Sequence, residues 1–185
     1  MPVVIGGKPE SSFADPIGLL GDCHRRIEAF LSVLGQVAAE AQGGPMSDSQ
    51  STAWKAALRY FREAAPKHTA DEEESLFPRL REIDRPEARA LLTRVDTLEA
   101  EHVCAGRAHD EVDRLGRLWL DDGSLPSEQA ARLCTVLGQL SELYRRHIAI
   151  EDGEVFPLAA TMLSALDRKA IGGEMAARRG LKPTL

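Results

Sequence analysis

The sequence is short of cysteine, of aromatic residues and of long apolar runs. Three cysteines are too few for a disulfide scaffold, and no basic patch followed by an apolar stretch opens the chain, so we expect a reducing, cytoplasmic location. No apolar run approaches the ~20 residues of a membrane-spanning helix. The 29 acidic residues outnumber the 23 lysines and arginines, and a net charge of −6 argues against nucleic acid or anionic lipid as partners.

The residues that are abundant favour helices. Alanine, leucine, arginine and glutamate dominate, only 5% of the residues are aromatic, and β-branched residues rarely cluster. We therefore expect an all-α protein with one main domain. The predicted division is an N-terminal extension (1–14), a helical domain (15–163) and a basic C-terminal tail (164–185). The tail is expected to dock as a short helix that begins at Ser164 and is interrupted at Gly172-Gly173.

Apolar residues at steps of three and four mark four long amphipathic helices. They are separated by loops near 42–45, 83–86 and 121–126, which hold most of the helix-ending glycines and prolines. Pro66 lies inside the second apolar stripe and must kink or open that helix. Four long helices with short connections predict an up-down-up-down antiparallel four-helix bundle.

One pattern occurs twice in the chain. Residues 68–78 and 147–157 both read His-x3-Glu-acid-x3-Phe-Pro, and a Leu-x3-His pattern that ends at His24 recurs at His102. The chain thus resembles one helical hairpin used twice. The repeated Phe-Pro pairs are expected to serve packing and helix bending.

The spacing predicts that four histidines meet. In an antiparallel hairpin, residues equidistant from the turn lie at the same height. The midpoints between consecutive histidines fall near positions 46, 85 and 124, inside the three predicted loops. One level of the bundle should therefore hold the inward imidazoles of His24, His68, His102 and His147.

Two glutamates share this level. Glu72 and Glu151 follow His68 and His147 by four residues and lie on the same helix faces. Buried carboxylates without a partner would cost several kcal/mol each, whereas a cation satisfies them together with the imidazoles. Six ligands are too many for one tetrahedral zinc. Two bridging carboxylates with two nitrogens per ion suit a dinuclear iron or manganese centre, its ions ~3.5–4 Å apart.

These motifs resemble the hemerythrin-like HHE cation-binding family over roughly residues 15–160. The resemblance implies two non-haem iron ions, joined by an oxo or hydroxo bridge. Their nitrogen ligands would be His24, His68, His102 and His147, and Glu72 and Glu151 would be the bridging carboxylates. Oxygen-carrying members have a second histidine one turn after the one that matches His102, where this chain has Gly106. The resemblance is therefore closer to members with four histidines.

The resemblance implies a role in the handling of oxygen, nitric oxide, peroxide or iron. One hypothesis is a protein that binds, senses or stores without turnover. A second is an enzyme that decomposes peroxide or reduces oxygen or nitric oxide, with His109 and Tyr144 as candidate relays. A third is a structural bundle whose polar centre binds zinc or nothing. The expected partners are a small diatomic ligand or peroxide, and a redox protein.

Several other polar residues lie near the predicted level. His109 is expected to be a core histidine or a neighbour of the ligands, because it lies ~10.5 Å along the axis from His102. Tyr144 is expected to be a core residue, with the relay as its alternative. Glu73 and Asp152 are expected to face solvent or to contact the ligands. Two further acids could orient histidines as hydrogen-bond acceptors, and these are Glu101 and Asp22. Small buried core residues are the expectation for Cys23, Cys104 and Cys134.

Overall fold

The computed structural model describes residues 11–181, and this part of the chain contains helices and no β-strand. The all-α prediction is confirmed. Within the same residues, no helix combines the length and the apolar character needed to cross a bilayer. The elements are α1 (Pro16–Ala41), α2 (Asp48–Glu63), α3 (Ala65–Asp71), η1 (Glu72–Leu76), α4 (Phe77–Glu82), α5 (Pro86–Asp122), α6 (Ser127–Ile150), η2 (Glu151–Val155), α7 (Phe156–Met162) and α8 (Ala165–Arg178).

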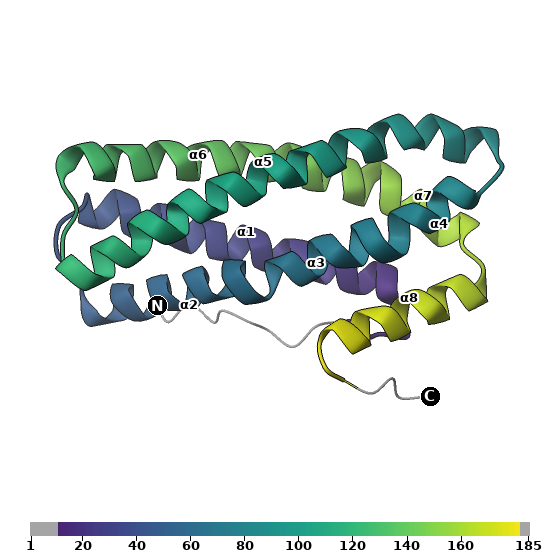
Figure 1. Ribbon diagram of the computed structural model, residues 1–185, viewed down its shortest axis with the longest axis horizontal. Coiled ribbons are helices and arrows are strands. Elements are labelled where there is room, and N and C mark those ends of the chain that lie inside the picture. The colour runs from purple at the N-terminus through teal and green to yellow at the C-terminus, as the bar shows by residue number, and fades with distance from the viewer. Residues whose placement is uncertain (1–10, 182–185) are drawn as a thin grey trace.

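The long helices lie side by side along the longest axis of the molecule (Figure 1). Helix α1 packs on α2 and α6, and α5 packs on α2 and α6. Local chemistry sets their ends. Pro16 occupies the first position of α1, where the Asp15 carboxylate accepts from the N–H of Gly18 at 3.1 Å. Ser47 and Gln50 cap each other's backbone N–H groups at the start of α2.

Two apolar cores fill the interior, one on each side of a buried polar layer. One core includes Leu34, Trp54 and Trp119. The other includes Leu20, Phe77 and Val95 and is closed by residues of α8. The polar layer between them consists of His24, His68, Glu72, His147 and Glu151, each at most 4% exposed. The interior is therefore apolar at both ends and ionisable at one level.

The second predicted helix is interrupted twice, and the first interruption is the one expected at Pro66. Helix α2 ends at Glu63 and α3 begins at Ala65, since proline has no N–H to continue the ladder. The second interruption is the π-helical turn η1, in which the N–H of Phe77 bonds the carbonyl of Glu72. The turn η2 repeats this bond between Phe156 and Glu151.

The π-helical turns explain how steps of four residues stay buried. Successive steps of four drift around a helix of 3.6 residues per turn, and a wider turn takes up that drift. His68, Glu72 and Leu76 are accordingly all buried, and so are their counterparts in the second half. A proline follows each π turn, where its missing N–H and its ring disfavour a regular α-helical ladder.

Helix α8 packs against α1, α3 and η1 (Figure 1). Its arginines reach a carboxylate that is 0% exposed, that of Asp71. Arg178 Nη1 donates to Asp71 Oδ1 at 2.9 Å and Arg179 Nη2 to Oδ2 at 2.6 Å. Arg178 also donates to the Ser75 hydroxyl at 2.8 Å. Two guanidinium groups thus compensate one buried charge next to Glu72.

The expected break at Gly172-Gly173 is wrong. Helix α8 continues through both glycines to Arg178. A side chain at Gly172 would collide with the backbone carbonyl of Phe13, so glycine allows the close approach of the two segments here. The helix persists because packing of Ile171 and Met175, both 0% exposed, outweighs the low helix propensity of glycine.

The three cysteines do not share one environment. Cys23 is buried as expected, but the prediction is wrong for Cys104 and Cys134, which are exposed. Both lie on the outer faces of long helices, where the apolar stripe does not pass.

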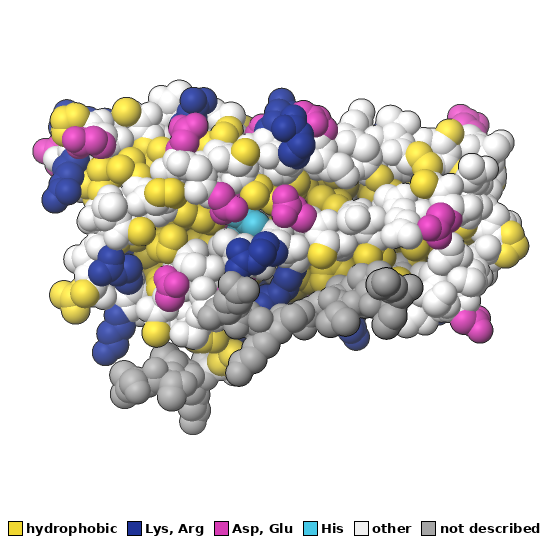
Figure 2. Space-filling model, turned by 180° about the vertical axis from the view of Figure 1, so that it is seen from behind, with side chains coloured by type: hydrophobic (Ala, Val, Ile, Leu, Met, Phe, Trp, Pro, Cys, Tyr) yellow, Lys and Arg dark blue, Asp and Glu magenta, His cyan; other side chains and the backbone are white. Residues whose placement is uncertain are grey.

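The side of the molecule that faces away from the viewer in Figure 1 carries cationic and acidic side chains interspersed, with apolar side chains between them (Figure 2).

The paired substitution Arg178→Ala with Arg179→Ala should destabilise the fold strongly. It leaves the Asp71 carboxylate buried without its cations, which costs about 3–5 kcal/mol. The matched control is Arg145→Ala with Arg146→Ala, an adjacent pair that forms ion pairs with exposed Glu142 and should cost less than about 1 kcal/mol. Denaturant unfolding measures both, and equal small effects would contradict the assignment.

Candidate metal centre

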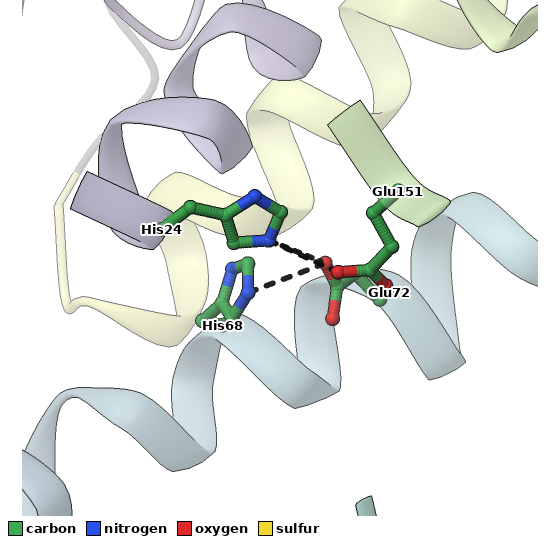
Figure 3. Close-up of side chains that lie close together, drawn as sticks. All are labelled: His24, His68, Glu72 and Glu151. Carbon is green, nitrogen blue, oxygen red and sulfur yellow. Dashed lines mark ion pairs between the residues drawn. The ribbon is translucent and has the colours of Figure 1, made fainter. Parts of the chain in front are cut away.

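The predicted site residues converge from four helical segments on one buried level. His24 comes from α1, His68 from α3, His102 from α5 and His147 from α6, and the glutamates open the two π turns. Potential ligand atoms of His24, His68, Glu72 and Glu151 all lie within 4.8 Å of one another (Figure 3). A second such group joins His102 and His147 with Glu151. The structure therefore brings all six together.

The Glu72 carboxylate spans the two histidine pairs. Its Oε1 lies 3.3 Å from Nε2 of His68 and 3.9 Å from Nε2 of His24. Its Oε2 lies 3.5 Å from Nε2 of His102. One oxygen therefore faces the first pair and the other oxygen faces the second pair.

The Glu151 carboxylate also contacts one histidine of each pair. Its Oε2 lies 3.0 Å from Nε2 of His24 and 3.2 Å from Nε2 of His147. The Nε2 atoms of His102 and His147 are 3.1 Å apart. Two nitrogens held ~2.1 Å from one ion at a right angle would be separated by about 3 Å, so this pair has the spacing of two ligands of one cation.

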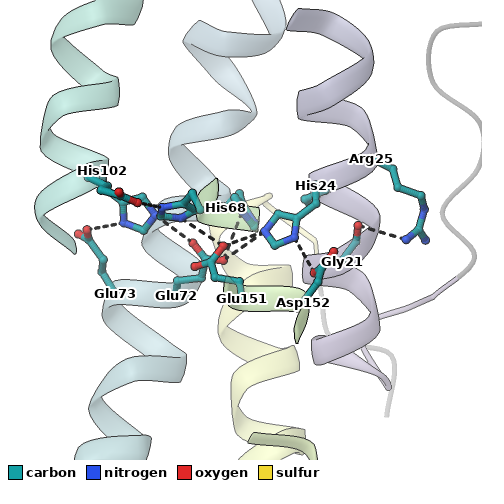
Figure 4. A network of polar contacts seen from close by, with 12 residues as sticks. Gly21, His24, Arg25, His68, Glu72, Glu73, His102, Glu151 and Asp152 are labelled. Carbon is teal, nitrogen blue, oxygen red and sulfur yellow. Dashed lines mark hydrogen bonds and ion pairs between the residues drawn. The ribbon is translucent and has the colours of Figure 1, made fainter. Parts of the chain in front are cut away.

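The outer ring nitrogens of three histidines meet carboxylates (Figure 4). Nδ1 of His24 lies 2.8 Å from Asp152, and Nδ1 of His102 lies 2.8 Å from Glu73. Each Nδ1–H can donate to its carboxylate, which fixes the tautomer and leaves the Nε2 lone pair facing the centre. Glu73 and Asp152 therefore contact the site histidines, one of the two alternatives that the sequence left open.

The third partner comes from α5. Nδ1 of His147 lies 3.0 Å from Glu101, which bears out the role expected for that glutamate. The same expectation is wrong for Asp22. Its carboxylate accepts from the N–H of Ser11 at 2.8 Å and pairs with Arg25 one turn along, because it points away from the centre of the bundle.

The repeated motifs act crosswise. Asp152, from the second motif, and the ring of Phe156, stacked at 5.2 Å, both position His24 of the first half. Glu73 and Phe77 of the first motif contact His102 in the same way, with ring centroids 6.5 Å apart. The sequence shows an acidic residue directly after each motif glutamate, which are Glu73 and Asp152. It does not show which histidine each of these acids contacts.

The buried atoms at the centre fit a cation. Nε2 of His24 and all four oxygens of Glu72 and Glu151 are buried without a hydrogen-bond partner in the described residues. Buried polar atoms are rarely left in that state in proteins. Because these lone pairs face one common volume, a cation with nitrogen and oxygen ligands satisfies them together.

The electrostatics of the metal-free cluster point the same way. Burial and the neighbouring Glu151 charge raise the pKa of Glu72 to about 8. Burial acts to lower the pKa of His24, but its hydrogen bond to Asp152 and the nearby charge of Glu151 raise it to about 12. Burial acts to raise the pKa of Glu151, but His147 and His24 lower it below its ordinary value. Protons thus occupy part of the cluster at neutral pH.

Comparison with known proteins identifies a family. Residues 15–159, most of the chain, match the family described as "Hemerythrin HHE cation binding domain".

The chain belongs to the hemerythrin HHE cation-binding family.

This membership makes cation binding the shared property, and the buried histidine and glutamate cluster fits it. An uncharacterized protein of Haemophilus influenzae is 28% identical over 173 residues, which cover 93% of this chain and 94% of the relative. The relative therefore carries no functional description to transfer. The division of the chain at residues 14 and 163 stays a prediction.

Two further residues form a pair beside the hemerythrin-like site. His109 Nε2 lies 3.0 Å from the hydroxyl of Tyr144, whose ring centroid is 6.3 Å from that of His147. His109 is in neither ligand group, as expected. Gly106 is exposed, and nothing lies within 4 Å of the position of a Cβ there apart from its own helix. The face one turn beyond His102 is therefore open.

Binding of Fe²⁺ should release protons at neutral pH. Coordination requires the unprotonated forms of Glu72 and His24, whereas Glu72 holds a proton below pH about 8. The apparent affinity should therefore fall as the pH drops below 8. Anaerobic calorimetry in buffers of different ionisation enthalpy measures the protons released. The Glu72→Gln variant should release fewer, and heats independent of the buffer would contradict this electrostatic account.

Proposed function

We propose that this protein is a hemerythrin-like four-helix bundle, in up-down-up-down order, that holds two non-haem iron ions. The ligands are His24, His68, His102, His147, Glu72 and Glu151. The observation that carries the proposal is that each glutamate contacts Nε2 of at least one histidine in each pair, while its oxygens have no hydrogen-bond partner within residues 11–181. One carboxylate that faces two imidazole pairs is arranged for two ions rather than one.

The chain's own groups favour a binding role. Four neutral imidazoles and two carboxylates form a nitrogen-rich set, and iron bound there supplies redox-active ions that can take up a diatomic molecule. Phe77 and Phe156 cover two of the rings, and both apolar cores exclude water from the layer. We therefore propose binding, sensing or storage, with oxygen, nitric oxide or iron as the species handled.

Removal of either bridging carboxylate should abolish the two-ion state. Glu72→Ala or Glu151→Ala should lower the iron content from two ions to one or none, because each carboxylate serves both histidine pairs. The matched control is Glu154→Ala, a half-exposed acid on the η2 turn that pairs with Arg94. Iron quantitation and absorption spectra before and after anaerobic addition of nitric oxide check this. A wild-type protein without stoichiometric iron would refute the proposal.

The alternative is a di-iron enzyme that decomposes peroxide or reduces oxygen or nitric oxide. The His109–Tyr144 pair favours it. A cleft of about 70 Å³, lined by His109, Arg62 and Asp110 among others, reaches His109 from the surface. Burial lowers the pKa of His109 to about 4 and raises the pKa of Tyr144, so a neutral imidazole accepts from the phenol. The pair is therefore a hydrogen-bonded link between the surface and the phenol ring that lies beside His147.

In this alternative, Tyr144→Phe should slow peroxide decomposition by the iron-loaded protein on the order of a hundredfold, the usual share of a positioned proton donor. Its iron content should equal that of the wild type, because the Tyr144 hydroxyl contacts His109 rather than the histidines and glutamates of the site. Tyr60→Phe is the control, since its hydroxyl contacts the Cys23 carbonyl instead. Absence of turnover in the wild type would leave the binding role alone.

A further inference from the structure

The four imidazoles differ in what their outer nitrogen meets. Three Nδ1 atoms lie 2.8–3.0 Å from a carboxylate, those of His24, His102 and His147. Nδ1 of His68 is buried and has no hydrogen-bond partner among the described residues. The His68 side chain is only 5% exposed, so solvent contact does not replace the missing acceptor.

The repeat shows which position lacks the acceptor. Glu101 directly precedes His102 on α5 and meets Nδ1 of His147 on the adjacent α6. In the first half, the residue that directly precedes His24 on α1 is Cys23, and α1 packs on the helix of His68. Cys23 is buried. By position in the repeat, the first half thus has a thiol, which is a weak acceptor, where the second half has a carboxylate.

This difference falls on one ion position only. One ligand group contains His24 and His68, and the other contains His102 and His147. Both imidazoles of the second group have a carboxylate on Nδ1, whereas the first group has one such imidazole. A carboxylate on Nδ1 orients a metal-binding imidazole and raises its basicity, and its loss typically weakens metal binding about 10- to 100-fold.

We infer that the two ion positions are unequal, with the His24–His68 position the weaker because Cys23 replaces the acceptor for His68. This inference rests on the proposed two-ion site. When the free Fe²⁺ concentration lies between the dissociation constants of the two positions, the protein carries a single ion, at His102 and His147. The second position then fills and empties in response to free Fe²⁺, which makes the centre a graded iron binder rather than an all-or-none one.

Two binding steps in the wild type do not suffice as a test, because two cations that share carboxylates repel each other even at equal positions. The test is an exchange of the two residues. Anaerobic titration with Co²⁺, followed by visible absorption, and with Fe²⁺, followed by calorimetry, resolves the steps. Cys23→Glu should strengthen the weaker step about 10- to 100-fold and leave the tighter step unchanged. Cys23→Ser, which is similar in size and has no carboxylate, should leave the difference in affinity between the two binding steps unchanged.

A second set of variants covers the case in which Cys23→Glu does not fold. Glu101→Cys should weaken the tighter step by the same factor. His68→Ala should keep the tighter step alone, whereas His147→Ala should lose it. Two bound ions with a gap that none of these exchanges changes would overturn the inference and leave the proposed function standing. A wild-type protein that binds neither Co²⁺ nor Fe²⁺ would overturn the proposed function itself.

Discussion

The structure depends on the compensation of two carboxylates buried between two apolar cores. Glu72 and Glu151 are fully buried, and ionised groups at such depth cost several kcal/mol each when they lack partners. The imidazoles face them at 3.0–3.9 Å, but these contacts leave the carboxylate oxygens without hydrogen bonds in the part of the chain that the structure describes. A polar layer of this kind is stable when a cation joins it. The family's cation binding and the fold are therefore parts of one arrangement.

Both halves of the internal repeat contribute residues to the buried polar layer, and each half contacts a histidine of the other. Each His-x3-Glu motif supplies a histidine and the glutamate that opens the following π-helical turn. The next acid and the phenylalanine of the motif contact the single histidine of the other half, which is His24 or His102. Neither half can orient its own single histidine. The site therefore exists only when both halves are packed together, which ties its geometry to the stability of the whole bundle.

Departures from the repeat are where individual function is expected. Cys23 is the counterpart of Glu101 in the repeat but has no carboxylate. Gly106 has no side chain and leaves the helix face one turn after His102 open. Asp71, whose counterpart is Ile150, carries the contact to α8 through Arg178 and Arg179. The repeated residues thus form the buried histidine and glutamate layer, and one unmatched residue, Asp71, connects this layer to α8.

The sequence alone determined the helical class and the level at which histidines and glutamates meet, because helix periodicity and loop midpoints place residues by simple geometry. It could not show the π turns, since a step of four fits both kinds of helix, and it missed the continuous α8, since packing against Phe13 overrides the propensity of Gly172 and Gly173. Only the tertiary structure decided which acid faces which imidazole. A side chain one position off the inward stripe turns either to solvent or to a neighbouring helix, and the distance to that neighbour is a property of packing rather than of sequence order.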